Sequence, residues 1–149
     1  MWRRARSLGP RDWLHLGEAA AALAWAHAIL RWSSPARVIG RATRVTRARA
    51  ASFTDAQLTR LVWTVGVAGR RVVRVPCQSR AVALARMLAR RGVVVEIRVG
   101  VRTIDGRLEA HAWVERDGRP MGEDQATIGR YAPFARPLTD LAAVRAHFR

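Results

Sequence analysis

The sequence predicts an α+β fold in which N-terminal helices and one cysteine-bearing helix pack on a small antiparallel sheet of at least three strands. Apolar residues recur at helical spacing up to Gly92, and beyond it they alternate with polar residues, as they do in strands. Two Asp-Gly pairs, Asp105-Gly106 and Asp117-Gly118, interrupt the alternating part. Asp-Gly is the preferred centre of a two-residue hairpin loop, so the strands are expected to form a meander.

The composition bounds the kind of protein. The chain has 149 residues, half of them apolar, which is enough for one domain over 1–149, divided into a helical region (1–50) and a core region (51–149). A single cysteine cannot form an internal disulfide, so a reducing, cytoplasmic location is expected. One cysteine and four histidines make a poor structural zinc site, and we expect neither a metal nor a cofactor.

The net charge of +16 is a weak indicator of nucleic-acid binding. All 27 basic residues are arginines, which suggests a GC-rich coding sequence. The charge still favours acidic partners, such as an acidic peptide, because the field acts at long range. The chain shows no helix-turn-helix, RNA-recognition or zinc-finger pattern, so no nucleic-acid partner is expected, although a basic binding protein without catalysis remains an alternative.

The N-terminal half is expected to hold two helices. The first is an alanine-rich buried or docking helix within Trp13–Leu30, whose glutamate and histidines argue against a stable membrane span and leave a peripheral membrane role open. A basic connector over 33–51 follows. Thr54 and Gln57 form a capping-box pattern that predicts a helix from about Asp55 to Val67.

Cys77 stands at the start of the next predicted helix, between Pro76 and the helix end at Gly92. A helix N-terminus stabilises a thiolate through its unpaired N–H groups and its dipole. Cys77 also lies on the apolar stripe of this helix, so a buried and inert thiol is the alternative interpretation.

Counting back from the two hairpin loops gives a strand register. The second hairpin places His111 opposite Asp124, and the first places Gly100 opposite His111. Directly opposed side chains share a face about 5 Å apart, close enough for an imidazole–carboxylate hydrogen bond. A slip of one residue would exchange Asp124 for Glu123 and break the agreement between the two hairpins, so Asp124 is preferred.

Cys77, His111 and Asp124 therefore form a candidate catalytic triad. His111 would keep the thiol ionised and protonate the leaving amine, and Asp124 would orient the ring. Trp113, on the same face, could screen the pair from water. An ordinary exposed histidine and an aspartate with a turn role are the alternatives.

The position of the cysteine helix affects this triad. If the helix packs on the strand face of Val95, Ile97 and Val99, Cys77 cannot easily reach His111. We therefore expect the helix on the opposite face of the sheet, with the N-terminal helices covering the valines.

Three segments, PCQSRAVALARMLARRG, VEIRVGV and EAHAWVERDGRP, resemble the transglutaminase-like cysteine peptidase domain of the B protein of lasso-peptide biosynthesis, in its small split form. The resemblance runs from about Val72 to Tyr131. It implies a papain/transglutaminase-like fold and a Cys-His-Asp triad, which maps onto Cys77, His111 and Asp124.

The resemblance also implies an activity. The protein would be a bacterial, cytoplasmic thiol protease that removes the leader from a ribosomally made precursor peptide and releases the core N-terminus for ring closure. A separate leader-binding protein and an ATP-dependent cyclase would be its partners, and no cofactor is implied. Another transglutaminase-like acyltransferase or amidase, or a partner protein without activity, remains an alternative.

Overall fold

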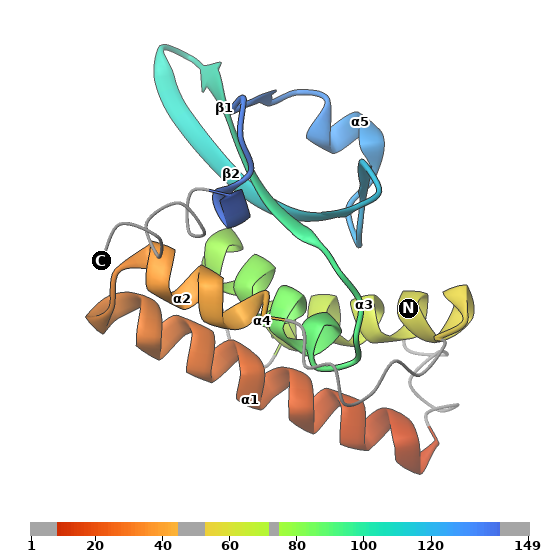
Figure 1. Cartoon of the computed structure of the whole chain (residues 1–149). Helices are drawn as coiled ribbons and strands as arrows, with labels where there is room; N and C mark the ends of the chain where they lie inside the picture. Colours follow the sequence, from red (N-terminus) through yellow and green to blue (C-terminus); the bar gives the residue numbers. More distant parts are fainter. Residues whose placement is uncertain (1–8, 45–52, 72–74, 141–149) are drawn as a thin grey trace.

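The computed structural model describes residues 9–44, 53–71 and 75–140, and it confirms the α+β class (Figure 1). The expected domain bounds also include 1–8, 45–52, 72–74 and 141–149, which lie outside the described residues. The elements in chain order are α1 (Pro10–Trp32), α2 (Pro35–Ala42), α3 (Asp55–Arg71), α4 (Cys77–Ala89), β1 (Glu96–Ile104), β2 (Arg107–Arg116), β3 (Arg119–Pro120), α5 (Gln125–Ile128) and β4 (Ala132–Pro133).

Helix α4 is the centre of the helical layer. It contacts α1, α2, α3 and the sheet, and nine of its residues are buried. Many of these are alanines, whose small side chains let neighbouring elements approach from several sides. Figure 1 shows the four longer helices grouped on one side, with the β1–β2 hairpin and α5 on the other. Within the described ranges no helix is both long and apolar enough to cross a membrane.

The segment predicted as a basic connector contains helix α2, so that prediction is wrong in part. Pro35 takes the first helical position, where its missing N–H costs nothing. Val38, Ile39 and Ala42 are buried on one side of the helix. The proline and glycine suggested a loop, but one apolar face is sufficient to dock a short helix on the core.

Helix α3 begins as predicted. The Thr54 N–H donates to Gln57 Oε1 at 3.0 Å, and the Gln57 N–H donates to Thr54 Oγ1 at 3.3 Å, which completes the capping box. The helix continues beyond the predicted end at Val67 to Arg71.

Both predicted hairpins are present. Asp105 and Gly106 have φ of 48° and 73°, and Asp117 and Gly118 have φ of 51° and 72°, as a type I′ turn requires at both central residues. Glycine and aspartate adopt this left-handed conformation at low cost, which explains why they occupy the loops.

The sheet has the order β3-β2-β1-β4 and is antiparallel throughout. Gly100 pairs with His111, as the hairpin count predicted. The sequence did not reveal β4, a fourth strand in which Ala132 pairs with Val101 of β1. It returns the chain to β1 after α5 and forms the edge of the sheet next to β1.

The cysteine helix packs on the valine face of the sheet, so the predicted opposite arrangement is wrong. Val95, Ile97 and Val114 belong to the same core cluster as the buried residues of α4. Trp113, on the other face, belongs to a second cluster that α5 and the segment after it supply. Each face of the sheet therefore has its own cover, and the larger apolar face is buried against α4.

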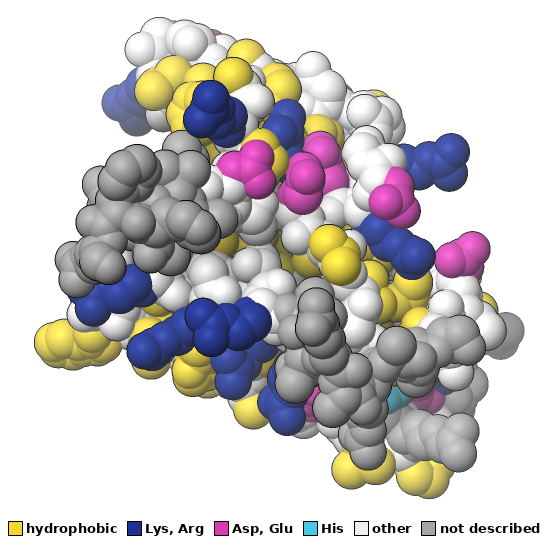
Figure 2. All heavy atoms as spheres, in the orientation of Figure 1, with side chains coloured by type: hydrophobic (Ala, Val, Ile, Leu, Met, Phe, Trp, Pro, Cys, Tyr) yellow, Lys and Arg dark blue, Asp and Glu magenta, His cyan; other side chains and the backbone are white. Residues whose placement is uncertain are grey.

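Charge is unevenly distributed between the two halves. Residues 96–124 contain seven of the eleven acidic residues but only five of the 27 arginines. Figure 2 shows acidic side chains gathered on the sheet half of the visible face and arginine side chains on both halves. The positive charge therefore lies mainly outside residues 96–124.

Candidate active site

Cys77 is the first residue of α4, and its thiol is half-buried against the helical core. Pro76 is the N-cap and has no side-chain oxygen to cap the helix. The first helical hydrogen bond runs from the Arg80 N–H to the Pro76 carbonyl, at 3.2 Å. The N–H groups of the first turn, starting with that of Cys77, therefore have no side-chain cap and can stabilise an anion.

His111 packs against two aromatic rings. Its ring centroid is 6.1 Å from that of Trp113, nearly parallel to it, and 5.1 Å from that of Tyr131. Trp113 and Tyr131 are buried, and the His111 side chain is 14% exposed. The two rings pack against the imidazole and leave little of it in contact with water.

Gly100 makes room for these rings. A Cβ atom on Gly100 would lie 2.9 Å from Tyr131 Cβ and 3.0 Å from both Trp113 Cη2 and the Ala132 carbonyl oxygen. The aromatic cover of His111 therefore depends on a residue without a side chain on the neighbouring strand.

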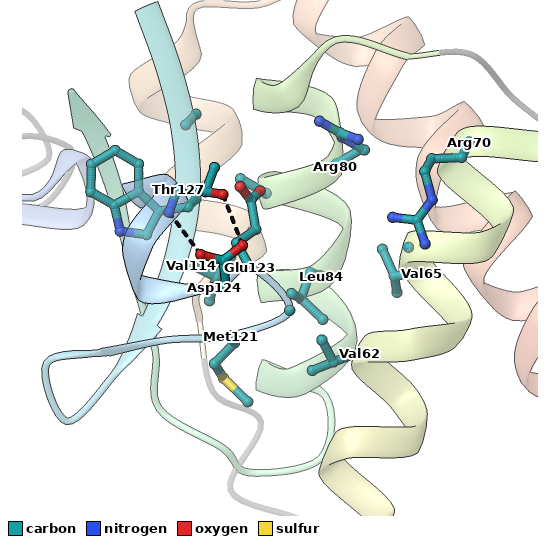
Figure 3. Close-up of a pocket in the computed structure, with 15 residues that line it drawn as sticks. Val62, Val65, Arg70, Arg80, Leu84, Val114, Met121, Glu123, Asp124 and Thr127 are labelled. Atoms are coloured by element: carbon teal, nitrogen blue, oxygen red, sulfur yellow. Dashed lines mark hydrogen bonds between the residues drawn. The ribbon is translucent and has the colours of Figure 1, made fainter. Parts of the chain in front are cut away.

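Glu123, and not Asp124, contacts the histidine. His111 Nε2 lies 2.6 Å from Glu123 Oε2. Asp124 is the N-cap of α5, and its carboxylate accepts hydrogen bonds from the Thr127 N–H and the Thr127 hydroxyl, both at 2.8 Å (Figure 3). The backbone hydrogen bond from Thr127 lowers the pKa of Asp124. The expected His111–Asp124 pairing is therefore corrected.

The hairpin count fails because β3 is only two residues long. The register holds from Arg119 to Pro120, and the last ladder-like contact is the hydrogen bond from the Met121 N–H to the Val114 carbonyl, at 2.8 Å. Gly122 then takes a φ of 82° and turns the chain away. A Cβ on Gly122 would lie 2.5 Å from Val62 Cγ1, so contact with α3 fixes this turn.

Tyr131 packs against His111, and burial raises the pKa of its phenol, while Arg102 opposes the rise and Glu109 adds to it. Cys77 packs against the core cluster on the valine face of the sheet, whereas His111 lies with Trp113 and Tyr131 on the other face. Among the described residues the structure therefore brings His111 and Glu123 together, and it records no contact of either with Cys77. Within the described residues no hydrogen bond joins the thiol to the imidazole. Because Nε2 is held by Glu123, Nδ1 is the ring nitrogen left for the thiol.

A pocket of about 300 Å³ lies next to this cluster, between α3, α4 and the edge of β2 that short β3 leaves uncovered. Trp113 and Glu123 line it on the sheet side, and Arg70 and Arg80 line it on the helical side (Figure 3). Its further lining residues are Val62, Val65, Gly66, Ala81, Leu84, Ala112, Val114, Met121, Gly122, Asp124 and Thr127.

The site offers a thiol, an imidazole and a carboxylate, which suit nucleophilic catalysis with acid–base assistance. Across the described ranges no group of three histidine, cysteine or acidic side chains could hold a metal ion. Sequence reasoning missed the contact of Glu123 and the contribution of Tyr131. The signal for Glu123 was Gly122, a residue that favours a bend and so weakens any register count across it.

Comparison with protein families gives one match. The sequence profile of the transglutaminase-like superfamily matches residues 19–136, which include Cys77, His111 and Glu123. Comparison with curated proteins and with solved structures gives no match.

Proposed function

Because the chain belongs to the transglutaminase-like superfamily, we propose that it is a cysteine peptidase with Cys77 as nucleophile, His111 as acid–base and Glu123 as the carboxylate that orients the imidazole. The superfamily includes cysteine peptidases and acyltransferases. The observation that carries the proposal is the His111–Glu123 pair, with Nε2 and Oε2 2.6 Å apart and the imidazole packed against two buried aromatic rings.

The proposed reaction has two steps, formation of a thioester on Cys77 and its hydrolysis, and His111 transfers a proton in each. The Cys77 thiolate attacks the carbonyl carbon of the scissile amide, and N–H groups at the start of α4 stabilise the oxyanion. Protonated His111 gives its Nδ1 proton to the amine as the C–N bond breaks, leaving a thioester. A water molecule then loses a proton to His111 and attacks the thioester, which releases the acid and restores the thiolate.

The proposed substrate is the leader region of a ribosomally made lasso-peptide precursor. Two motifs support this assignment, PCQSRA around Cys77 and EAHAWVERDG around His111. Cleavage would free the core N-terminus for a separate ATP-dependent cyclase, in the cytoplasm. A separate leader-binding protein would present the substrate, and the arginine-rich helical half would favour an acidic peptide or partner.

Mass spectrometry of the precursor peptide tests this function. The peptide is incubated with its leader-binding partner and with wild type, Cys77→Ala or His111→Ala, and His27→Ala on α1 is the matched control. We expect cleavage at one leader–core bond by wild type and His27→Ala, and no cleavage by the other two variants.

Two results would overturn the peptidase assignment. An intact peptide in a complex that still forms would make the chain a binding subunit with a core thiol at Cys77. An isopeptide product with an added amine, in place of hydrolysis, would identify an acyltransferase that uses the same three residues.

A further inference from the structure

We propose that Arg70 and Arg80 form a subsite that binds a carboxylate side chain of the peptide substrate, in the pocket that meets α4 one helical turn after Cys77. The inference rests on the proposed function, because it names the chemistry of substrate that the same site prefers. A carboxylate in this pocket would meet two guanidinium groups, which bind carboxylates through paired N–H donors.

The pocket presents the two arginines from different helices. Arg70 comes from the end of α3 and Arg80 from the first turns of α4, and both line the 300 Å³ pocket. Figure 3 shows them on the helical wall, with Glu123 and Asp124 on the sheet side. A ligand in the pocket would therefore lie between the cationic wall and the catalytic strand.

The carboxylates of the pocket are already engaged, whereas the arginines are not. Glu123 is bound to His111, and Asp124 is bound to Thr127. Five other arginines in the described segments pair with carboxylates within 4.0 Å. Arg70 and Arg80 have no such partner among the described residues. The pocket thus has two arginines without a carboxylate partner and two acids that each hold a partner of their own, Glu123 through Oε2 and Asp124 through both oxygens.

Two glycines of α3 hold space for these side chains. A Cβ on Gly69 would lie 3.0 Å from Arg80 Cδ, and a Cβ on Gly66 would lie 3.3 Å from Arg70 Nη1. Glycine inside a helix costs about 1 kcal/mol relative to alanine, and the close packing of the two arginines on the helix offsets this cost. The Arg80 stem thus lies against Gly69, and the Arg70 guanidinium lies against Gly66.

The subsite lies close to the bond that would be cut. Arg80 is three residues after Cys77, on the same side of α4, and such positions are about 5 Å apart. An extended peptide advances about 3.3 Å per residue. The acidic side chain would therefore belong to a substrate residue within about two or three positions of the scissile bond.

Alkylation of Cys77 tests the subsite without any peptide. Iodoacetate carries a carboxylate, iodoacetamide is its neutral analogue, and with both reagents the thiolate sulfur displaces iodide from the methylene carbon. Cys77 is the only cysteine, so the mass of the intact protein reports the reaction. The quantity measured is the ratio of the iodoacetate rate to the iodoacetamide rate, which cancels changes in thiolate fraction.

The proposal expects this ratio to fall about three- to tenfold in Arg70→Gln and in Arg80→Gln, and to fall in wild type as salt is raised. Arg80→Lys keeps the charge and should retain most of the ratio. Arg107→Gln, an equal charge change at the exposed start of β2, is the control and should leave the ratio unchanged.

An unchanged ratio in both glutamine variants would overturn the subsite, and so would an equal fall in Arg107→Gln, since it would reflect net charge alone. The test separates this proposal from the peptidase function. If the precursor stays intact but the ratio falls as expected, the carboxylate subsite stands and leader cleavage fails.

Discussion

His111 Nε2 and Glu123 Oε2 lie 2.6 Å apart, although the two residues belong to a strand and to a loop that has already left the sheet. Gly122 turns the chain so that Glu123 reaches back to the strand while Asp124 caps α5. The two neighbouring acids thus have different roles: Glu123 contacts the histidine, and Asp124 caps the backbone of α5. Because Glu123 occupies Nε2, Nδ1 is the imidazole nitrogen that remains available to another group.

The tautomer of His111 follows from this contact. An ionised carboxylate only accepts hydrogen bonds, so neutral His111 must carry its proton on Nε2 and present an unprotonated Nδ1. Nitrogen-15 NMR of labelled protein should show the Nε2–H tautomer, and Glu123→Gln should reduce its population. A dominant Nδ1–H form in wild type would mean that the ring is turned.

Gly100→Ala should disturb the aromatic cover of His111. The new Cβ meets Tyr131 and Trp113 at about the 3 Å limit of close contact, so we expect a loss of about 1–3 kcal/mol in the free energy of unfolding. Gly17→Ala on the exposed side of α1 is the control, since nothing lies within 4 Å of its Cβ, and it should stabilise by about 0.5–1 kcal/mol. Thermal unfolding and near-ultraviolet circular dichroism measure both. Equal effects of the two substitutions would contradict the packing described.

The ion pair of Glu18 and Arg91 should make stability fall at acid pH. Arg91 donates from Nη1 to Oε1 at 2.9 Å and from Nη2 to Oε2 at 2.6 Å, joining α1 to the segment after α4, and this hydrogen bonding lowers the pKa of Glu18. Because the pKa of Glu18 is lower in the folded protein, its ionised carboxylate stabilises the fold at pH values above its ordinary pKa of 4.5. This stabilisation is lost as the pH falls through the folded pKa. Glu18→Gln should therefore cost about 1 kcal/mol at pH 7.

The cost of Glu18→Gln should shrink as the pH falls below 4.5 and through the lowered folded pKa of Glu18, as measured by thermal unfolding across pH. Glu96→Gln, at an exposed glutamate on β1, is the control and should show little difference across the same pH range. A penalty for Glu18→Gln that stays constant with pH would show that the ion pair contributes nothing.

Asp124→Ala should loosen α5. The substitution removes both hydrogen bonds to Thr127, whereas Asp124→Asn keeps an oxygen that can accept from the Thr127 N–H. Amide hydrogen exchange over residues 125–128 should be faster in the alanine variant and close to wild type in the asparagine variant. Equal protection in all three proteins would show that the cap is not what orders this turn.

Local signals predicted a large part of the fold. The capping box of Thr54 and the two Asp-Gly loops depend on neighbours within a few residues, and the structure confirms all three. The pairing of Gly100 with His111 followed because the Asp105-Gly106 turn leaves only one register. The superfamily match agrees with the resemblance carried by the cysteine and histidine motifs.

The parts that were missed depend on tertiary contacts. Helix α2 is short and is held by burial of one apolar face, which a basic composition concealed. The turn at Gly122 is fixed by Val62, sixty residues earlier in the chain, so no count along β2 could identify Glu123 as the partner. The face of the sheet on which α4 packs likewise depends on how all the helices and strands pack together, which local sequence patterns do not show. The catalytic roles of Cys77, His111 and the acid remain predictions.

The rate of precursor cleavage by Glu123→Gln and Asp124→Asn tests the central claim most directly. If Glu123 orients His111, Glu123→Gln should lower kcat/KM by about 10²- to 10⁴-fold, as loss of an orienting carboxylate does in other triads, and Asp124→Asn should stay within a few-fold of wild type. A collapse of kcat/KM in Asp124→Asn with near-normal cleavage by Glu123→Gln would contradict the account.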